Sequence, residues 1–329
     1  MLPNYYIFLF ILMSSTILSM SSNSWLGAWM GMEMNLLVFI PLMSNLKNCF
    51  STESSMKYFL IQAFASSLLL FSSFLIHMNF LFNLNYILLM STLLLKMGAA
   101  PLHFWFPLVS EGLTWKMNMI LMTWQKLAPM TLISYISFNL SILLQIISLI
   151  SIIVGSILGL NQTSMRKIMA YSSINHMGWM ISTFFLNKVL WKIYFIVYSF
   201  LTILILQIFN NYKIYFFNQM FMTNNMNKTM KFITFCNFLS LGGLPPFLGF
   251  LPKWFILNNL IMNNYYMLMT IMSIFTLINM FYYLRLSMNS LLYLNLQLKW
   301  NLSNYYYSMN IILTFCSMFG LMLSFIFFY

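Results

Sequence analysis

The sequence predicts an all-α polytopic membrane protein with about eleven transmembrane helices. Three observations predict this fold class. The 329 residues are 61% hydrophobic and only 5% charged, which is more apolar surface than a soluble domain could bury. The apolar residues form successive runs of about 17–25 residues, the length that a helix needs to cross a bilayer. Glycine and proline interrupt two of these runs, which predicts two broken helices.

The predicted helices follow one another with short connections and no linker between soluble domains. They lie near residues 4–20, 24–45, 56–77, 82–106, 117–137, 140–160, 169–187, 190–209, 229–260, 263–285 and 308–328. The ninth is too long for one straight crossing, which fits a helix in two parts. Residues 286–307 form either an amphipathic helix in the interface or a plain loop. No basic region precedes the first apolar run, so we expect no removable signal peptide.

The fourth helix ends in the stretch Lys-Met-Gly-Ala-Ala-Pro-Leu-His-Phe-Trp-Phe-Pro, from Lys96 to Pro107. A lysine at the bilayer centre costs at least roughly 3 kcal/mol, so Lys96 should face protein or water and have a function. Gly98 removes a side chain and Pro101 removes a backbone donor, so the helix is expected to break here. A broken helix beside an ionisable group is a common ion site in transporters.

A second stretch, Gly-Gly-Leu-Pro-Pro-Phe-Leu-Gly-Phe-Leu-Pro-Lys-Trp, interrupts the ninth helix and ends in a second lysine, Lys253. Gly242 lies 144 residues after Gly98, and the same spacing separates Pro245 from Pro101. Pro107 matches Pro252 only after a one-residue slip. The second break comprises Gly242, Gly243, Pro245 and Pro246. Two breaks of this kind, each with a lysine, predict an internal repeat.

The order of the broken helices predicts how the two copies run. The fourth and ninth helices are five apart, an odd number, so the copies cross the membrane in opposite directions and form an inverted repeat. The expected division is residues 1–139 for the first five-helix repeat and 140–285 for the second. Residues 286–307 form the interfacial segment, and residues 308–329 form a C-terminal transmembrane helix.

The basic residues of the loops predict the orientation. One side collects Lys47, Lys57, Lys116, Arg166, Lys167, Lys213, Lys228, Lys231, Arg285 and Lys299. The other side collects only Lys188 and Lys192. The positive-inside rule places the richer side in the cytoplasm or the matrix, with the N-terminus there and the C-terminus opposite. Because these cations are scattered singly between apolar runs, the net charge of +12 does not indicate nucleic-acid binding.

Glu33 and Lys126 are the ionisable residues expected in the second and fifth helices. Glu33 is the only acid in a predicted span, and it is either a proton-relay carboxylate or the structural partner of a lysine. Gly27 and Gly31 precede it and predict close helix packing. Lys126 is followed by Pro129, which loosens the local hydrogen bonding. Burial disfavours a charged lysine and a carboxylate favours it, so the charge states of these groups depend on one another.

Two histidines are further candidates for a relay. His103 lies in the first break, and His176 lies in the seventh helix. Adding the repeat offset of 144 to the position of Glu33 gives 177, next to His176. His176 therefore either takes the place of the carboxylate in the second repeat or is a structural histidine. The sequence contains no phosphate-binding loop, dinucleotide fingerprint or haem or iron–sulfur ligand set. Cys49, Cys236 and Cys316 show no metal or disulfide spacing.

Five stretches resemble the antiporter-like membrane-arm subunits of mitochondrial NADH:ubiquinone oxidoreductase, respiratory complex I, and among them the chain 2 family. Two are the broken-helix stretches quoted above. The others are Trp-Met-Gly-Met-Glu-Met-Asn around Glu33, Trp-Gln-Lys-Leu-Ala-Pro around Lys126 and Tyr-Ser-Ser-Ile-Asn-His-Met-Gly-Trp-Met around His176. They cover about residues 25–260 in the family's order. The larger family has fourteen helices. The predicted number of about eleven matches the shortened animal form, which lacks the first three helices.

The resemblance implies residue roles and surroundings. It implies that Glu33, Lys96, Lys126 and Lys253 match the family's mid-membrane glutamate and three key lysines. It implies the inner mitochondrial membrane, with the basic face toward the matrix, and other membrane-arm subunits as partners, including neighbouring antiporter-like chains. No cofactor is expected in this chain; NADH, FMN, iron–sulfur clusters and ubiquinone belong to the whole complex. Binding of cardiolipin at the basic face is a hypothesis from charge alone.

The mechanism implied is proton translocation driven by redox chemistry in other subunits. A change in the charge of Glu33 would alter Lys96, then Lys126, then Lys253. The alternative is a stand-alone cation/proton antiporter, although a sodium site usually contains more acids than Glu33 alone. A third reading is a membrane scaffold whose lysines only hold helices together.

Overall fold

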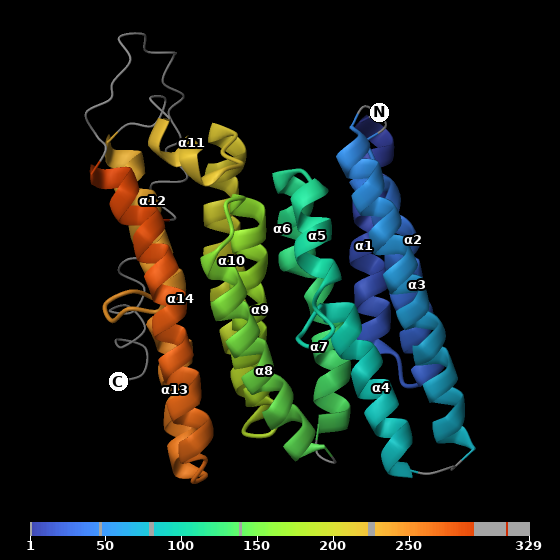
Figure 1. Cartoon of the computed structure of the whole chain (residues 1–329). Coiled ribbons are helices and arrows are strands. Elements are labelled where there is room, and N and C mark those ends of the chain that lie inside the picture. Colours follow the sequence, from blue (N-terminus) through green and yellow to red (C-terminus); the bar gives the residue numbers. More distant parts are fainter. Residues whose placement is uncertain are drawn as a thin grey trace. The chain divides into compact units, whose positions relative to one another are not determined.

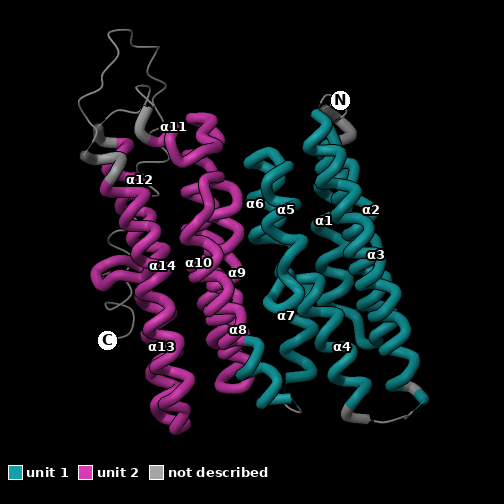
Figure 2. Tube along the Cα trace, in the orientation of Figure 1, with its two compact units in different colours: residues 1–147 teal, residues 148–329 magenta. Residues whose placement is uncertain are grey.

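The computed structural model describes residues 2–45, 48–78, 82–137, 140–222 and 228–292, together with Thr314. These residues form helices joined by turns, with one isolated bridge between Ser164 and Phe216, which confirms the all-α class. The chain divides into two compact units, residues 1–147 and 148–329 (Figure 2). Among the described residues, 5 helices are long and apolar enough to cross a membrane, and shorter apolar helices accompany them.

Unit 1 is built from helices that run side by side (Figure 1). They are α1 (Leu2–Ser21), α2 (Trp25–Met43), α3 (Cys49–His77), α4 (Phe82–Met97), α5 (Trp105–Gly112), α6 (Trp115–Met122) and α7 (Trp124–Ile136). Helix α2 packs against α1 and α3, while α7 packs against α1 and α4. A Cβ atom at Gly31 would lie only 2.7 Å from Ser19, which confirms the predicted close packing of this helix.

Helix α8 (Ser141–Leu160) leads into unit 2. The other helices of this unit are α9 (Met165–Thr183), α10 (Lys188–Tyr212), α11 (Phe217–Met222), α12 (Lys228–Gly242), α13 (Phe250–Met262) and α14 (Tyr266–Leu292). Helix α10 packs against α9, α12 and α13, and α14 packs against α12 and α13. Helix α9 is buried along nearly its whole length, so its polar side chains lie inside the protein.

Serine and threonine are common in these helices because their hydroxyl groups are satisfied within the helix. Ser72, Ser151 and Thr183, for example, each donate a hydrogen bond to the carbonyl three residues earlier. Helical backbone groups also bond within the helix, which is what a hydrocarbon environment requires.

Three predicted elements need correction. Helix α3 begins at Cys49, earlier than expected, and includes Glu53, which forms an ion pair with Lys57 at 2.5 Å. The predicted helix 117–137 is two helices, α6 and α7, separated at Thr123. Helix α14 continues to Leu292, because Leu286 and Ser287 are buried in the packed helix.

Two further predictions concern the segments after residue 285. Residues 286–292 are therefore helix α14 and not the interfacial segment, and residues 293–307 lie outside the described residues. The predicted last helix, 308–328, also lies outside them except for Thr314. Glu111, which falls between the predicted helices 82–106 and 117–137, lies near the end of α5.

Candidate functional site

The first predicted break is present between α4 and α5. Gly98 has a φ of 73°, the left-handed conformation that only glycine adopts readily. Its N–H donates to the Leu95 carbonyl at 3.1 Å, and the Ala99 N–H donates to the Leu94 carbonyl at 3.1 Å. This pair of bonds is the Schellman pattern that ends helices. Pro101 follows in the turn, preceded by a cis peptide bond.

The second break, between α12 and α13, repeats this backbone pattern. Gly243 has a φ of 80°. Its N–H donates to the Ser240 carbonyl at 3.0 Å, and the Leu244 N–H donates to the Leu239 carbonyl at 3.3 Å. Each of these residues lies 145 positions after its counterpart in the first break. The backbone thus makes the same turn in both units.

This match corrects the register of the predicted repeat. The sequence paired Gly98 with Gly242, but the left-handed glycine of the second break is Gly243. Glycine is strongly favoured where φ is positive, and sequence spacing could not distinguish two adjacent glycines. With the offset of 145, Pro107 and Pro252 also correspond without a slip.

The carbonyl groups at the end of α4 are capped by neutral side chains. The Trp105 indole donates to the Leu95 carbonyl at 3.0 Å, and the Gln62 amide of α3 donates to the Lys96 carbonyl at 3.3 Å. The last carbonyls of a helix have no partners within the helix, so such caps offset the cost of the break in a membrane.

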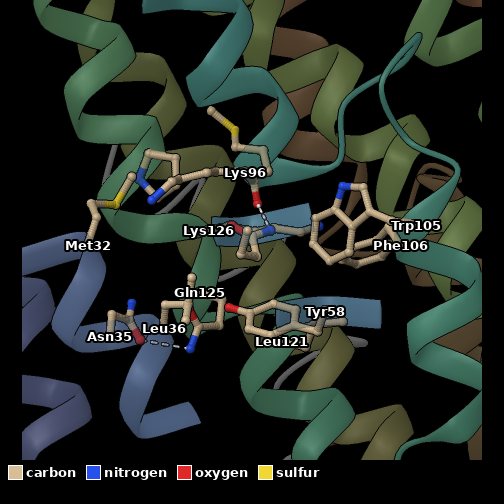
Figure 3. A pocket seen from close by; sticks show the side chains of 13 residues that line it. Met32, Asn35, Leu36, Tyr58, Lys96, Trp105, Phe106, Leu121, Gln125 and Lys126 are labelled. Atoms are coloured by element: carbon tan, nitrogen blue, oxygen red, sulfur yellow. Dashed lines mark hydrogen bonds between the residues drawn. The ribbon is translucent and has the colours of Figure 1, made fainter. Parts of the chain in front are cut away.

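Lys96 and Lys126 line one cavity inside unit 1 (Figure 3). Both side chains are buried, and the cavity is about 20 Å³ in volume. The Lys126 ammonium lies 5.2 Å from the centroid of the Phe106 ring, within the range of a cation–π contact. The cavity is lined by Met32, Asn35, Leu36, Tyr58, Gln62, Lys96, Met97, Trp105, Phe106, Leu121, Gln125, Lys126 and Pro129. The structure therefore brings two of the predicted relay lysines together.

Local structure explains how α7 presents Lys126. The helix starts after Thr123, whose hydroxyl donates to the Met119 carbonyl at 2.6 Å, and the Lys126 N–H bonds to the Thr123 carbonyl. The interruption at Thr123 was not predicted, and Pro129 lies within α7. Its ring still leaves the Gln125 carbonyl without the usual helical donor.

Glu33 is half-buried on α2, and it is close enough to Lys96 for the two charges to interact. Its Oε2 atom is enclosed, with no hydrogen-bond partner among the described residues. The ion pair found within 4 Å in the described part of the chain is Lys57–Glu53, so the expected alternative of a direct Glu33–lysine pair is not formed there.

Lys253 is the buried cation of unit 2. Its ammonium donates to the Gly242 carbonyl at 2.6 Å, at the end of α12. It also lies 5.9 Å from the centroid of the Trp179 ring on α9. The ammonium therefore lies at the carbonyl end of a helix and over an aromatic face.

The two histidines have different surroundings. His176 on α9 is buried, and its Nδ1 lies 2.8 Å from the Tyr194 hydroxyl of α10. The ring of Tyr198 is 5.1 Å away. His103 lies in the first break, with Nδ1 at 3.2 Å from the Pro101 carbonyl. It does not line the cavity that Lys96 and Lys126 share.

Sequence reasoning missed the polar side chains that surround the lysines. Asn35, Gln62 and Gln125 lie in helices α2, α3 and α7 and line the cavity of unit 1, and Tyr194 contacts His176 in unit 2. The argument that singled out the lysines, that polar groups in membrane spans have a purpose, could have found these amides too. No cluster of three or more His, Cys, Asp or Glu side chains in the described ranges could hold a metal ion.

Comparison with known proteins identifies relatives over nearly the whole chain. Residues 22–279 match the family model described as NADH:quinone oxidoreductase/Mrp antiporter. The NADH-ubiquinone oxidoreductase chain 2 of Anopheles gambiae is 52% identical over 329 residues, which cover 96% of each chain. The protein of the same name from Loxodonta africana is 37% identical, covering 91% of this chain and 90% of the relative.

Solved structures show the same fold. A chain of respiratory complex I from Thermus thermophilus superposes with a TM-score of 0.86 at 20% identity, covering 97% of this chain and 77% of that one. A chain of the Mrp complex from a Dietzia species gives a TM-score of 0.76 at 13% identity, covering 85% of this chain and 59% of that one.

Proposed function

The chain belongs to the NADH:quinone oxidoreductase/Mrp antiporter family and, within it, to the NADH-ubiquinone oxidoreductase chain 2 family, and from this premise we propose that its buried lysines carry protons across the membrane. It is an antiporter-like membrane-arm subunit of respiratory complex I. The observation that carries the proposal is the placement of the buried Lys96 and Lys126 on one cavity beside a helix break.

The proposed relay runs from Glu33 through Lys96 and Lys126 to Lys253. A proton gained or lost at Glu33 changes the charge that Lys96 experiences, and each lysine in turn affects the next. His176 and His103 are proposed as secondary members, and the Tyr194 hydroxyl supports His176 in this role because it offers the imidazole a hydrogen-bonded exchange partner. The relay residues have no redox chemistry of their own, so NADH, FMN, iron–sulfur clusters and ubiquinone would act in other subunits.

We further propose that the two breaks mark inverted repeats, residues 1–139 and 140–285. The shared offset of 145 and the matching left-handed glycines support this division. The remaining residues would form a connecting segment and an additional C-terminal transmembrane helix. The unequal division of loop cations supports an N-terminus on the matrix side and a C-terminus on the intermembrane-space side.

The proposed location is the inner mitochondrial membrane, in contact with neighbouring antiporter-like chains of the membrane arm. Basic residues on the proposed matrix face, such as Arg166, Lys167 and Arg285, would favour anionic lipids such as cardiolipin there. The stand-alone antiporter is not favoured, because the relatives at 37% identity or more carry the oxidoreductase name, whereas the Mrp similarity is one of fold.

The test is Glu33→Gln in membranes where assembly of the complex is verified. We expect proton pumping to be lost, with NADH oxidation slowed or uncoupled, since the amide cannot change its charge. Proton uptake and NADH oxidation should be measured together in sealed vesicles. Unchanged pumping per NADH oxidised would exclude Glu33 from the relay.

A further inference from the structure

A second cavity lies within unit 2, and no residue of the proposed relay lines it. Its volume is about 660 Å³, within the range of pockets that bind small molecules. The turn between α8 and α9, the start of α11 and the last part of α14 form its walls. The lining residues are Leu160, Asn161, Gln162, Thr163, Phe216, Phe217, Asn218 and Arg285. Arg285 is the one charged residue among them.

Hydrogen bonds hold the two turns of this cavity together. The Met165 N–H donates to the Tyr215 carbonyl at 2.9 Å. The Phe217 N–H donates to the Thr163 carbonyl at the same distance of 2.9 Å. The Gln219 Oε1 accepts a further bond from the Tyr215 N–H at 2.7 Å. The cavity walls are therefore in place before a ligand arrives, which lowers the entropic cost of binding.

Arg285 places a positive charge on the wall of this cavity. Its Nη2 donates to the Leu160 carbonyl at 2.6 Å, at the end of α8. Its guanidinium carbon lies 5.7 Å from the centroid of the Phe217 ring. A guanidinium has five N–H donors, and among the described residues Leu160 is the one hydrogen-bond acceptor that Arg285 engages. The group therefore has donors left for a ligand.

The charge of Arg285 has no counter-ion in the sequence of its own unit. The three acids of the chain are Glu33, Glu53 and Glu111, and all of them belong to unit 1. Residues 148–329 therefore contain no carboxylate side chain to balance the half-buried guanidinium. Because a charge that is partly removed from water is stabilised by an opposite charge, we expect the ligand of this cavity to be an anion.

The surroundings of the cavity match the boundary between lipid headgroups and acyl chains. Leu160 ends a helix that is long and apolar enough to cross a membrane, and Arg285 lies near the end of another, Tyr266–Met288. Phe281 and Leu284 are exposed on one face of α14, on the turn before Arg285. A ligand with acyl chains would cover these two side chains, whereas a free phosphate would leave them exposed.

We propose that this cavity binds the phosphate group of one anionic phospholipid, with Arg285 as its main contact. The inference rests on the proposed lipid binding at the basic face and assigns it a single site. The planar guanidinium would donate to the phosphate oxygens, and the side-chain amides of Asn161 and Asn218 would add neutral donors. An acyl chain would lie along Phe281 and Leu284.

A purely structural role for Arg285 predicts a different result. As a cap of α8, the guanidinium would serve only the Leu160 carbonyl, which is one of the carbonyls that a helix end leaves without a helical partner. Its loss would then affect the stability of the subunit and leave lipid binding unchanged. Arg285→Gln keeps an N–H donor and removes the charge, so it separates the two roles.

The experiment uses the assembled complex in phosphatidylcholine vesicles with a small share of phosphatidylglycerol that carries a photoreactive group beside its phosphate. The measured quantity is the labelling of residues 160–163. In Arg285→Gln we expect this labelling to fall about tenfold, the scale of one charge-assisted hydrogen bond. Arg166→Gln is the matched control, because it removes the same charge from α9 but Arg166 does not line the cavity. It should retain most of the labelling.

Competition in the native complex identifies the source of the phosphate group. An excess of unlabelled phosphatidylglycerol should displace the photoreactive lipid, whereas an excess of inorganic phosphate should not. Phe281→Ser should also lower the labelling, because it removes part of the apolar face. Displacement by inorganic phosphate would show a site for free anions and overturn the proposal. Equal losses in Arg285→Gln and Arg166→Gln would overturn it too, since they would show attraction by diffuse charge alone.

The pattern of labelling distinguishes failure of this inference from failure of the proposed lipid binding. Labelling spread evenly over the basic face would leave the proposed binding standing and exclude the single site. Labelling no stronger than that by a photoreactive phosphatidylcholine would exclude both. If Arg285→Gln does not assemble, Arg285→Lys decides: lysine keeps the charge without the planar fork, so labelling should fall in part, and unchanged labelling would exclude the guanidinium contact.

Discussion

The two broken helices make the same backbone turn, but their lysines lie on opposite sides of it in the sequence. Gly98 and Gly243 make the same left-handed turn with the same pair of hydrogen bonds. In the first unit Lys96 precedes the break, and its counterpart in the second unit is Leu241. In the second unit Lys253 follows the break, and its counterpart in the first is Leu108.

The difference shows that one backbone motif can support two kinds of site. In the first unit the neutral side chains of Trp105 and Gln62 cap the helix end, and Lys96 contributes to a cavity instead. In the second unit the charge itself is the cap, because Lys253 donates to Gly242. Replacing a lysine that caps a helix end should therefore lower the stability of the subunit more than replacing a lysine that faces a cavity.

The largest predicted effect separates the two lysines by stability. Lys253→Met removes a charge-assisted hydrogen bond to a buried carbonyl and should destabilise the subunit by about 1.5–3 kcal/mol. Lys96→Met keeps the Gln62 cap, so its cost should be below about 1 kcal/mol. Thermal release of the subunit from the purified complex measures both.

Both substitutions should abolish pumping, which makes stability the discriminating readout. Lys253→Arg is the control, because it keeps a donor and a charge near the helix end and should preserve most of the stability. Equal melting temperatures for Lys253→Met and Lys96→Met would show that the ammonium is not the cap of α12.

The second prediction concerns the two turning glycines. Gly98→Ala and Gly243→Ala each force a side chain into a left-handed conformation, at a cost of about 1–2 kcal/mol. The new methyl group would meet the Phe106 ring in the first unit and the end of the Lys253 side chain in the second. Gly243→Ala should therefore also disturb the Lys253 contact, whereas Gly98→Ala should act through the ring beneath Lys126.

The measurements to compare between the two variants are the amount of assembled complex and the rate of proton pumping. Gly155 offers a different kind of control: it sits in a helix, and its substitution tests close packing without a positive φ. A Gly98→Ala variant as stable as the native chain would mean that the turn adopts another conformation.

Several features of the site followed from the sequence because they depend on residue type. A lysine, a glycine and a proline in an apolar run were enough to predict both breaks, since each has a large local cost in a membrane. The positions of Asn35 and Gln125 on one cavity were not predictable, because they depend on how α2 and α7 pack. The interruption at Thr123 also lacks a glycine or proline signal.

A third, smaller effect should come from the aromatic rings under the two ammonium groups. Phe106→Leu removes the face 5.2 Å from Lys126, and Trp179→Leu removes the face 5.9 Å from Lys253. We expect each to disfavour the charged lysine by about 0.5–2 kcal/mol. The pH profile of pumping should shift toward lower pH, because the neutral amine forms more easily.

The shift should be larger for Phe106→Leu, since Lys253 keeps its bond to the Gly242 carbonyl. Phe106→Tyr and Trp179→Phe retain a ring and serve as controls. A larger shift for Trp179→Leu would reverse the comparison and assign the stronger cation–π contact to unit 2.

The smallest effect is expected for the indole cap of the first unit. Trp105→Phe removes the donor to the Leu95 carbonyl, but the Gly98 N–H still bonds to the same oxygen. The loss should therefore be at most about 0.5 kcal/mol, against about 1 kcal/mol for Gln62→Met, which removes the side-chain cap of the Lys96 carbonyl. Both are measured by thermal release of the subunit. If Trp105→Phe costs as much as Lys253→Met, then a neutral cap is worth as much as a charged one, and the distinction between the two helix ends fails.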